Sequence, residues 1–271
     1  MGFKWERSAF CIRQGVGSLS PRLRLQNSPA RDLRAPNLSI MADYHIRRYK
    51  DTDYETVRDL FASGTKEQAT ALRKYVMKLP RTKFFLLAVL LAQILGFTSS
   101  SLSVLQLIFC LVTCLFGVLV VVWFGSYHIF ASYVHVMLRE DMLDIQAHYV
   151  QKEGACFWVA ESNGEVVGLV AAEPYYGAGG GKKVELKRLS VSKACRGCGI
   201  GKALCQTVIS FARQEGCEGV ILETTMVQYS ALKLYENLGF KRIHFFTRPS
   251  FVHKLFHFVV MMYRYDILSH N

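Results

Sequence analysis

The sequence predicts an α/β protein, whose mixed central sheet is flanked by helices and interrupted by a hydrophobic helical segment. A glycine-rich turn, RGCGIG at 196–201, joins an apolar strand pattern to an amphipathic helix pattern. A second strand, helix and strand pattern follows at 219–246. An apolar run at 104–124 is long enough to be a separate helix. Together these three observations predict the fold class.

The first 40 residues predict a basic, disordered extension. They hold seven Lys and Arg residues against Glu6 and Asp32, with scattered Ser and Pro. This composition is typical of a mitochondrial transit peptide, but the amphipathic helix of such a peptide is missing. Because Met41 directly precedes the first strand pattern, a start of translation at Met41 is the alternative interpretation.

Residues 41–66 predict the first strand and helix of the main domain. The segment YHIRRYK at 44–50 favours a strand, and Asp51 or Thr52 suits the N-cap of the helix that follows. Apolar residues recur on one side of that helix, namely Tyr54, Val57, Leu60 and Phe61.

The chain is 51% hydrophobic, and the excess is concentrated in one place. No Asp, Glu, Lys or Arg occurs from Phe84 to Leu138, and the run at 104–124 is long enough to cross a bilayer core of about 30 Å. A shorter apolar run occupies 84–97. We assign 84–130 to a transmembrane or re-entrant segment and 67–83 to a basic flank before it. A buried core helix is the alternative, but soluble helices of this length carry a polar face.

Two membrane topologies compete. Five Lys and Arg residues stand at 73–83, whereas Arg139 is followed by Glu140, Asp141 and Asp144, so the upstream flank is predicted to be cytosolic. A single type II span would place the chain after Phe124 in the lumen. Strand pairing cannot cross a bilayer, so a first strand that belongs to the main domain requires a hairpin that returns to the cytosol. We favour the hairpin.

Residues 131–271 predict the main domain. The strand patterns CFWVAES and EVVGLVAAEPYY are joined by Asn163-Gly164, a strong hairpin signal. The strand VELKRLSV, the helix KALCQTVISFARQEG, the strand GVILETT, the helix VQYSALKLYENLGF and the strand FKRIHFF follow in order.

Charge and cysteine content limit the kinds of partner and ligand that the chain is expected to bind. The net charge of +12 lies largely in the first 40 residues and in the flank before the apolar segment, so membrane lipid is the expected partner and nucleic acid is not. The eight cysteines show no disulfide framework. Cys195 and Cys198 form a C-x-x-C without a second pair, so we expect no metal.

The glycine turn predicts a diphosphate site. Gly197, Gly199 and Gly201 leave backbone N–H groups uncovered, and the following helix adds its positive end. A dinucleotide fingerprint would need glycine at 204, where Leu204 stands. A tight strand-to-helix turn without a ligand is the alternative.

The spacing R-x-x-G-x-G, entered from a strand and opening a helix, resembles the acyl-CoA loop of the GNAT N-acetyltransferase superfamily. The segment LYENLGF resembles the second signature of that superfamily, A-x-x-x-Y-x-x-x-G-F, with Ala231, Tyr235, Gly239 and Phe240 in the matching places. The resemblance covers 44–61 and 156–265. It implies a GNAT acyl-CoA N-acyltransferase fold with acetyl-CoA as co-substrate and no metal.

The resemblance also implies a binding site for acetyl-CoA. Its loop residues are Arg196, Gly197, Cys198, Gly199, Ile200, Gly201 and Lys202. The end of the preceding strand, Leu189, Ser190 and Val191, would supply a backbone N–H to the thioester carbonyl. Gln228 stands where many members have Asn, which puts the bond to the pantetheine portion in doubt.

Two residues are candidates for the chemistry. By resemblance Tyr235 protonates the departing CoA thiolate, a task that suits a phenol with a pKa of about 10; a core tyrosine is the alternative. Glu185 is the candidate base, and a surface glutamate paired with Lys187 or Arg188 is the alternative. Lys182 and Lys183 end the loop GAGGGKK and would attract an acceptor carboxylate, unless that loop is simply solvated.

A GNAT domain split by a long hydrophobic segment, with KRLSVSKACRGCGIGKAL and TTMVQYSALKLYENLGF, resembles the camello-like, N-acetyltransferase 8-like family. This implies an endoplasmic reticulum membrane enzyme that acetylates the α-amine of a small amino-acid-like acceptor, such as a cysteine S-conjugate. Protein-lysine acetylation, including that of histones, is the alternative, although a basic loop would repel a histone tail. A non-catalytic membrane scaffold with a CoA-binding domain is the second alternative.

Overall fold

The computed structural model describes residues 43–99, 103–177, 180–247 and 258–267. Residues 1–39 separate from 40–271 as a unit of their own. The basic extension expected at 1–40 lies outside the described residues.

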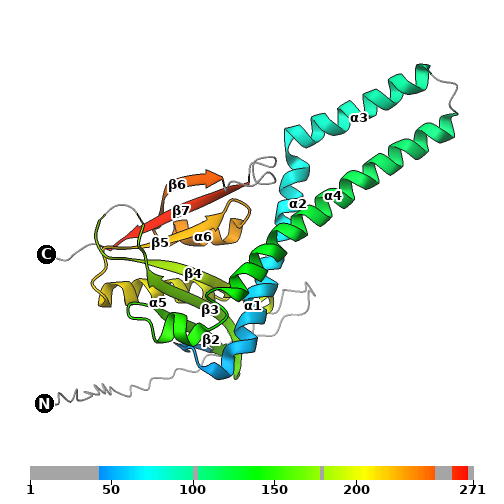
Figure 1. Cartoon of the computed structure of the whole chain (residues 1–271). Coiled ribbons are helices and arrows are strands. Elements are labelled where there is room, and N and C mark those ends of the chain that lie inside the picture. Colours follow the sequence, from blue (N-terminus) through cyan, green and yellow to red (C-terminus); the bar gives the residue numbers. More distant parts are fainter. Residues whose placement is uncertain (1–42, 100–102, 178–179, 248–257, 268–271) are drawn as a thin grey trace, which may run out of the picture. The chain divides into compact units, whose positions relative to one another are not determined.

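The described strands form one mixed sheet of seven strands in the order β1-β2-β3-β4-β5-β7-β6 (Figure 1). Within this sheet β4 and β5 are parallel and the other neighbours antiparallel. The strands are β1 Tyr44–Arg48, β2 Cys156–Ser162, β3 Glu165–Pro174, β4 Lys183–Val191, β5 Gly219–Thr225, β6 Lys241–Thr247 and β7 Val259–Asp266. The α/β class with a mixed sheet is confirmed.

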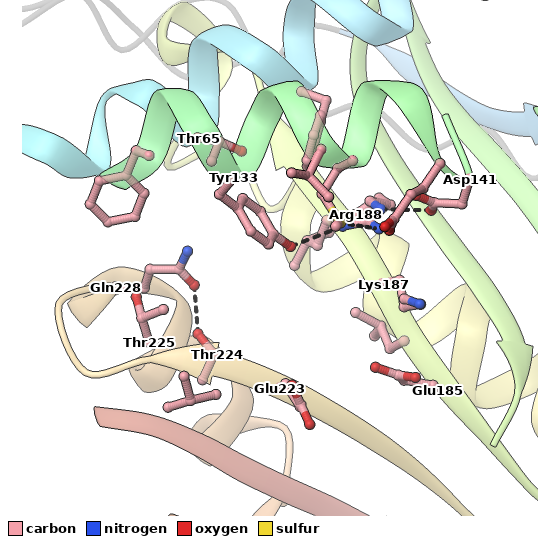
Figure 2. Close-up of a pocket in the computed structure, with 18 of the residues that line it drawn as sticks. Thr65, Tyr133, Asp141, Glu185, Lys187, Arg188, Glu223, Thr224, Thr225 and Gln228 are labelled. Carbon is pink, nitrogen blue, oxygen red and sulfur yellow. Dashed lines mark hydrogen bonds and ion pairs between the residues drawn. The ribbon is translucent and has the colours of Figure 1, made fainter. Parts of the chain in front are cut away.

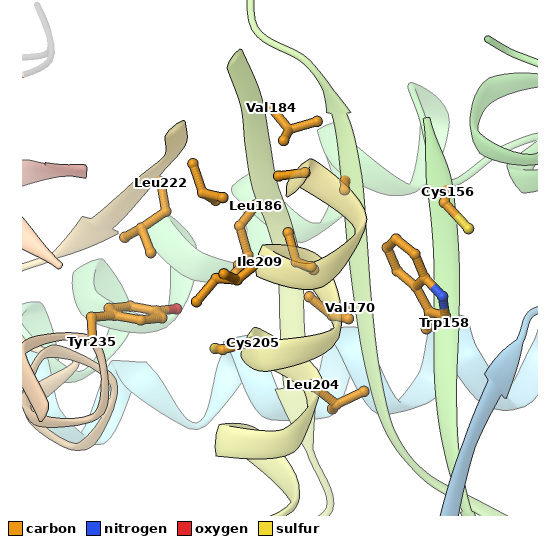
Figure 3. Packing of buried hydrophobic residues seen from close by; sticks show 14 of the residues in the cluster. Cys156, Trp158, Val170, Val184, Leu186, Leu204, Cys205, Ile209, Leu222 and Tyr235 are labelled. Carbon is orange, nitrogen blue, oxygen red and sulfur yellow. The ribbon is translucent and has the colours of Figure 1, made fainter. Parts of the chain in front are cut away.

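The long helices lie on both faces of the sheet and beside it. They are α1 Tyr54–Lys66, α2 Gln68–Lys78, α3 Pro80–Ser99, α4 Val104–Arg139, α5 Ile200–Gln214 and α6 Tyr229–Asn237. Alternate residues of β2 belong to two cores: Phe157 and Val159 pack with α1, whereas Trp158 and Ala160 pack with α5 (Figure 3). Burial on both faces explains why β2 is almost entirely apolar.

The first strand and helix belong to the sheet domain. β1 pairs with β2 along its whole length, from Tyr44 opposite Ser162 to Arg48 opposite Trp158. α1 packs so closely on β4 that a Cβ at Gly64 would lie 2.5 Å from the Ser190 hydroxyl oxygen. The hairpin predicted at Asn163-Gly164 is confirmed, because both residues have positive φ, 52° and 80°, between β2 and β3.

The N-cap expected at Asp51 or Thr52 is wrong. These residues form a 3-10 turn, Asp51–Asp53, and Asp53 stands at the start of α1. The Asp53 carboxylate accepts hydrogen bonds from the Lys50 backbone N–H at 2.9 Å and from Arg47 Nη1 at 2.7 Å. The bond from Arg47 on β1 therefore holds the chain in the extra turn before the helix begins.

The apolar segment forms two helices that run side by side (Figure 1). Gln93 Nε2 of α3 donates to the carbonyl oxygen of Cys110 on α4 at 3.4 Å. Among the described helices, α4 is by itself long and apolar enough to cross a membrane, whereas α3 qualifies only together with the helical stretch before it, from which it bends by 59°. Large apolar side chains stand open on both helices, including Phe84 at 69% and Leu105 at 80% exposure.

α4 continues well beyond the apolar run. Its 36 residues pass through the boundary expected at 130/131, so one helix carries both the apolar segment and the first part of the main domain. α2, which lies in the expected basic flank, packs Leu72 and Val76 against Val122 and Phe130 of α4.

Candidate active site

The sheet opens between its two parallel strands. β4 and β5 pair from Lys183 opposite Gly219 to Leu186 opposite Leu222, although both strands continue further. A bulge in β4 follows at once, and Arg188 there has a φ of +59°. Beyond Leu186, β4 therefore has no partner in β5.

A cavity of about 810 Å³ lies in this opening (Figure 2). Its walls come from β3, β4, β5, β7, α1, α4, the stretch before α6, and α6 itself. Glu185, Lys187 and Glu223 make part of its polar surface, while Phe130 and Tyr133 of α4 make part of its aromatic surface.

Glu185 lies half-buried in the cavity wall. Burial disfavours its charged form and raises the pKa of the carboxyl; Lys187 opposes this, and Glu223 and Glu173 add repulsion. The ion pair with Lys187 or Arg188, considered as the alternative, is not formed: Lys187 bonds Glu173 and Arg188 bonds Asp141.

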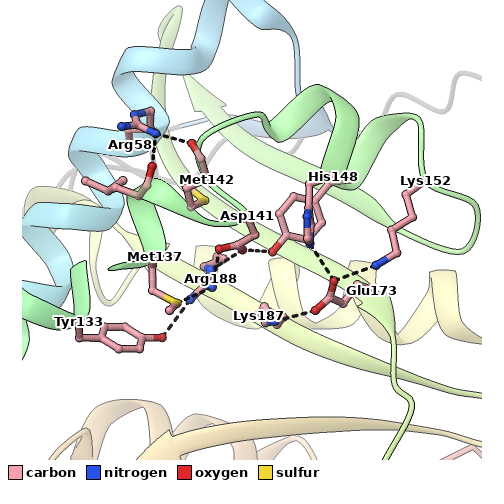
Figure 4. A network of polar contacts seen from close by, with 12 residues as sticks. Arg58, Tyr133, Met137, Asp141, Met142, His148, Lys152, Glu173, Lys187 and Arg188 are labelled. Carbon is pink, nitrogen blue, oxygen red and sulfur yellow. Dashed lines mark hydrogen bonds and ion pairs between the residues drawn. The ribbon is translucent and has the colours of Figure 1, made fainter. Parts of the chain in front are cut away.

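Glu173 stands directly opposite Glu185, on β3. Its carboxylate oxygens lie 2.6 Å from Lys187 Nζ, 3.1 Å from His148 Nε2 and 3.3 Å from Lys152 Nζ (Figure 4). Burial alone would raise the pKa of this carboxyl, but its partners lower it to about 2. Glu173 is therefore a fixed negative charge beside Glu185.

A buried ion pair joins the end of α4 to the bulge of β4. Arg188 Nε and Nη2 donate to the two Asp141 oxygens at 2.8 and 2.7 Å, and Nη1 donates to the Tyr133 hydroxyl at 2.9 Å. The Arg188 and Asp141 side chains are 5% and 6% exposed, and the Tyr149 hydroxyl also donates to Asp141. Burial would raise the pKa of Asp141, but the bonds from Arg188 hold it below its ordinary value. This bidentate contact fixes one wall of the cavity.

The glycine turn has room for a ligand. Gly197 and Gly199 have φ values of +87° and +84°, and Gly199 caps α5. A Cβ at Gly197 would meet nothing within 4 Å, and one at Gly199 only the Tyr44 hydroxyl at 3.9 Å. Ile200 is buried and fixes the turn to the core, whereas Cys198 and Lys202 are exposed. Since the first N–H groups of a helix lack partners within the helix, the open turn fits the diphosphate of acetyl-CoA.

The other residues expected to bind acetyl-CoA lie near the turn, but some of their polar groups already have partners within the protein. Arg196 Nη1 lies 2.7 Å from Glu67 Oε2, and Arg196 Nε donates to the Val191 carbonyl at 3.0 Å, so a contact with phosphate stays a prediction. Leu189 lines the cavity, and the Ser190 hydroxyl donates to the Leu60 carbonyl. Leu189, Ser190 and Val191 lie past the point where β5 departs, which is where a carbonyl-binding N–H is expected. Gly201 lies close to Leu234 of α6, 3.4 Å from an added Cβ to Leu234 Cδ2.

Tyr235 belongs to both the core and the cavity. Its ring packs against Phe240 and Tyr263 at centroid distances of 5.8 and 6.4 Å, and the residue is 5% exposed. Burial, with a smaller contribution from Cys205, raises the pKa of its phenol. Gln228 also lines the cavity, and its amide oxygen accepts from the Thr224 hydroxyl at 2.6 Å.

The structure thus brings Glu185, Leu189, Gln228 and Tyr235 to one cavity. Lys182 and Lys183 do not line it: Lys182 Nζ pairs with Glu215 at 3.2 Å, and the buried Lys183 donates to the Gly180 carbonyl.

Glu173, Glu223 and the Asp141–Arg188 pair were not among the sequence candidates, although they line the cavity. Charged residues inside otherwise apolar strands were the available signal for Glu173 and Glu223. Nothing local in the sequence links Asp141 to Arg188, because the two lie 47 positions apart.

Within the described part of the chain, Cys195 and Cys198 are free thiols. No group of three or more His, Cys, Asp or Glu side chains among these residues is arranged to hold a metal ion.

Comparisons with known proteins agree with this geometry. The model of the acetyltransferase (GNAT) family matches residues 123–240. A probable N-acetyltransferase camello from Xenopus tropicalis is 43% identical over 229 residues, which cover 84% of this chain and 100% of the relative. The N-acetyltransferase 8B of Homo sapiens is 42% identical over 79% of this chain and 89% of its own length. A GNAT acetyltransferase structure from Staphylococcus aureus, 18% identical, covers 83% of this chain and 100% of its own with a TM-score of 0.48. The camello and N-acetyltransferase 8B relatives show that the chain belongs to the camello-like, N-acetyltransferase 8 family of GNAT enzymes, which are acetyl-CoA-dependent N-acetyltransferases.

Proposed function

We propose that the enzyme transfers acetyl from acetyl-CoA to the α-amine of a small amino-acid-like acceptor with an apolar substituent, such as a cysteine S-conjugate. The observation that carries this proposal is the composition of the cavity. Carboxylates and cations of β3 and β4 share the lining with aromatic side chains of α4, and Arg188 of β4 contacts Tyr133 of α4 (Figure 2). An amphipathic small molecule matches such a pocket.

Glu185 acts as the base in this proposal. The raised pKa of its carboxyl brings it closer to the pKa of an amine, which favours proton transfer from the acceptor, directly or through one water. The freed amine attacks the thioester carbonyl, which a backbone N–H of Leu189–Val191 polarises. The C–N bond forms as the C–S bond breaks, and the Tyr235 hydroxyl gives its proton to the CoA sulfur. The proton still in excess on the new amide nitrogen returns through water to the Tyr235 phenolate. The products are the neutral amide and free CoA, and Glu185 releases to solvent the proton that it took from the acceptor ammonium.

The acceptor carboxylate is assigned to Lys187 and Arg188, which line the cavity, in place of Lys182 and Lys183. Each keeps its carboxylate partner, so the acceptor adds to an existing network. The apolar substituent lies against Phe130, Tyr133 and Met137 of α4.

Membrane insertion of α3 and α4 as a hairpin, at the endoplasmic reticulum, is the second part of the proposal. The exposed apolar side chains of both helices support it. The pairing of β1 with β2 supports a return to the side of entry, because a single span would separate these two strands. The acetyltransferase domain then faces the cytosol.

Release of free CoA by the detergent-solubilised full chain tests the acceptor. S-benzylcysteine and a histone-tail peptide are offered in parallel, and we expect turnover with the cysteine conjugate alone. Turnover with the peptide alone would move the assignment to protein lysines. No release of CoA with either acceptor, while acetyl-CoA still binds, would overturn both assignments.

A further inference from the structure

A second concavity, of about 470 Å³, lies between α2 and α4 and contributes nothing to the acetyl-transfer cavity. We call it the α2–α4 groove. Arg73, Lys74 and Lys78 of α2 line one side of it. These positions lie on one face of the helix, so three positive charges converge on one groove.

No acidic side chain neutralises these charges within α2, which contains no Asp or Glu. Lys74 and Lys78 are exposed, and in the described parts of the chain none of the three cations forms an ion pair. Arg73 Nη2 donates to the Thr70 hydroxyl at 2.8 Å, which leaves its charge uncompensated. The groove therefore favours an anion.

The rest of the groove is apolar. Met77 of α2 and Leu119, Val122 and Trp123 of α4 complete its lining. Trp123 is 54% exposed and stacks on Tyr127, with ring centroids 6.2 Å apart and planes 8° apart. A cationic rim above an apolar floor matches a molecule with an anionic head and a hydrocarbon tail, and a free phosphate would use only the rim.

The position of the groove along the helices agrees with this chemistry. From Val104 to Trp123 the helix rises about 30 Å, the thickness of a bilayer core. Trp and Tyr concentrate at the membrane boundary, and Lys83 is the last charge before the apolar part of α3. Trp123 thus marks the boundary on α4 within the groove itself, and Lys83 follows the groove residue Lys78 by five positions.

We infer that the α2–α4 groove binds an anionic glycerophospholipid, with its headgroup at Arg73, Lys74 and Lys78 and an acyl chain along Leu119 and Val122. This inference rests on the membrane insertion proposed above. It adds a defined lipid site to a general affinity for the bilayer.

Quenching of Trp123 fluorescence tests the inference. The full chain in mixed micelles is titrated with phosphatidylserine that carries dibrominated acyl chains, and in parallel with equally brominated phosphatidylcholine. We expect quenching at a much lower mole fraction of phosphatidylserine. Trp123→Phe should remove the lipid-specific signal, which separates it from Trp5 and the buried Trp158.

Charge variants decide whether the groove itself is responsible. The triple variant Arg73→Gln, Lys74→Gln, Lys78→Gln should weaken the phosphatidylserine response roughly a hundred-fold, since each cation near an anionic headgroup contributes about five-fold. The control replaces three exposed cations of the sheet domain, Lys233→Gln, Lys241→Gln and Arg242→Gln, with the same change in net charge. It should keep the response.

Three results would overturn the inference: equal quenching by the two lipids, equal losses in both triple variants, or full competition by soluble glycerophosphoserine, which lacks acyl chains. Acetyl-CoA turnover, measured on the same preparations, and alkaline extraction of native membranes report separately on the proposed function. If the enzyme is active and membrane-inserted but the groove does not distinguish the two headgroups, the lipid site is refuted and the proposed function is not.

Discussion

Burial raises the pKa of both proposed acid–base residues, Glu185 and Tyr235, and the consequence for proton transfer differs between them. For Glu185 the shift makes the carboxylate a stronger base. For Tyr235 it makes the phenol harder to deprotonate, so the residue stays in its protonated form throughout the neutral pH range. The same apolar surroundings therefore make Glu185 a stronger base and keep Tyr235 protonated, so that its hydroxyl proton is present when the thiolate leaves.

Glu185→Gln should remove the acid limb of the pH profile of kcat/KM. Glu185 acts only when charged, so activity rises as the pH rises through its pKa, which burial holds above the ordinary 4.5. We expect a loss of about 10²- to 10⁴-fold at neutral pH. The measurement is the pH–rate profile beside that of Glu153→Gln, an exposed glutamate outside the cavity. An unchanged acid limb in Glu185→Gln would exclude it as the base.

Tyr235→Phe should lower kcat by about 10²-fold or more while the Kd for acetyl-CoA stays nearly constant, because only the proton donor is lost. The apolar ring and its packing against Phe240 are kept. Tyr229→Phe, at the exposed start of α6, is the matched control. Steady-state kinetics and calorimetric binding check both values, and a normal kcat would assign the proton donation to another group.

At the scale of elements, the turn before α5 should determine acetyl-CoA binding. Gly199→Glu places a negative side chain in the diphosphate position and should abolish binding. Gly216→Glu is the control, because Gly216 has a φ of +66° and open surroundings at the far end of α5. Both variants carry the strain of a side chain at positive φ, about 1–2 kcal/mol, so equal thermal stabilities with unequal binding would isolate the cradle. Retained binding in Gly199→Glu would refute the assignment of the turn to CoA.

The contact between α4 and the β4 bulge should be costly to break. Asp141→Asn leaves the Arg188 guanidinium buried without its counter-charge, and we expect a loss of about 3–5 kcal/mol in the free energy of unfolding. Asp59→Asn, an exposed position on α1, should cost less than about 0.5 kcal/mol. Denaturant titration in detergent measures both, and equal stabilities would show that Asp141 and Arg188 are not coupled.

Elements with a strong local pattern were predictable from the sequence. β2 and β5 begin and end where their residues predicted, and the glycine turn lies between β4 and α5 as expected. α2 was missed because its apolar residues, which alternate with cations, are buried only by contacts with distant parts of the chain, chiefly α4. The insertion of β7 between β5 and β6 was missed because strand order depends on long-range pairing. Glu173 was not predicted as a site residue for the same reason, since its partners Lys187, Lys152 and His148 come from elements that meet only in the fold.

At the scale of the whole molecule, the hairpin predicts that the residues before and after it face the same side of the membrane. In sealed microsomes a membrane-impermeant maleimide should label a variant whose single cysteine is Cys198, which is exposed. It should equally label a single-cysteine variant with Asp43→Cys, before β1. Labelling at 43 with protection at 198 until detergent is added would establish a single span.

The pairing of β1 with β2 has a consequence for how the protein is made. Arg48 leaves the ribosome about 110 residues before its partner Trp158, a delay of roughly ten seconds at ordinary rates of synthesis. The apolar hairpin is translated within that delay, so the membrane insertion proposed for it would begin before the sheet can close. β1 remains with an unpaired edge that carries Arg47 and Arg48, and positive charge of this kind discourages wrong strand pairing. The sheet can therefore be completed only after the apolar hairpin and β2 have both been synthesised.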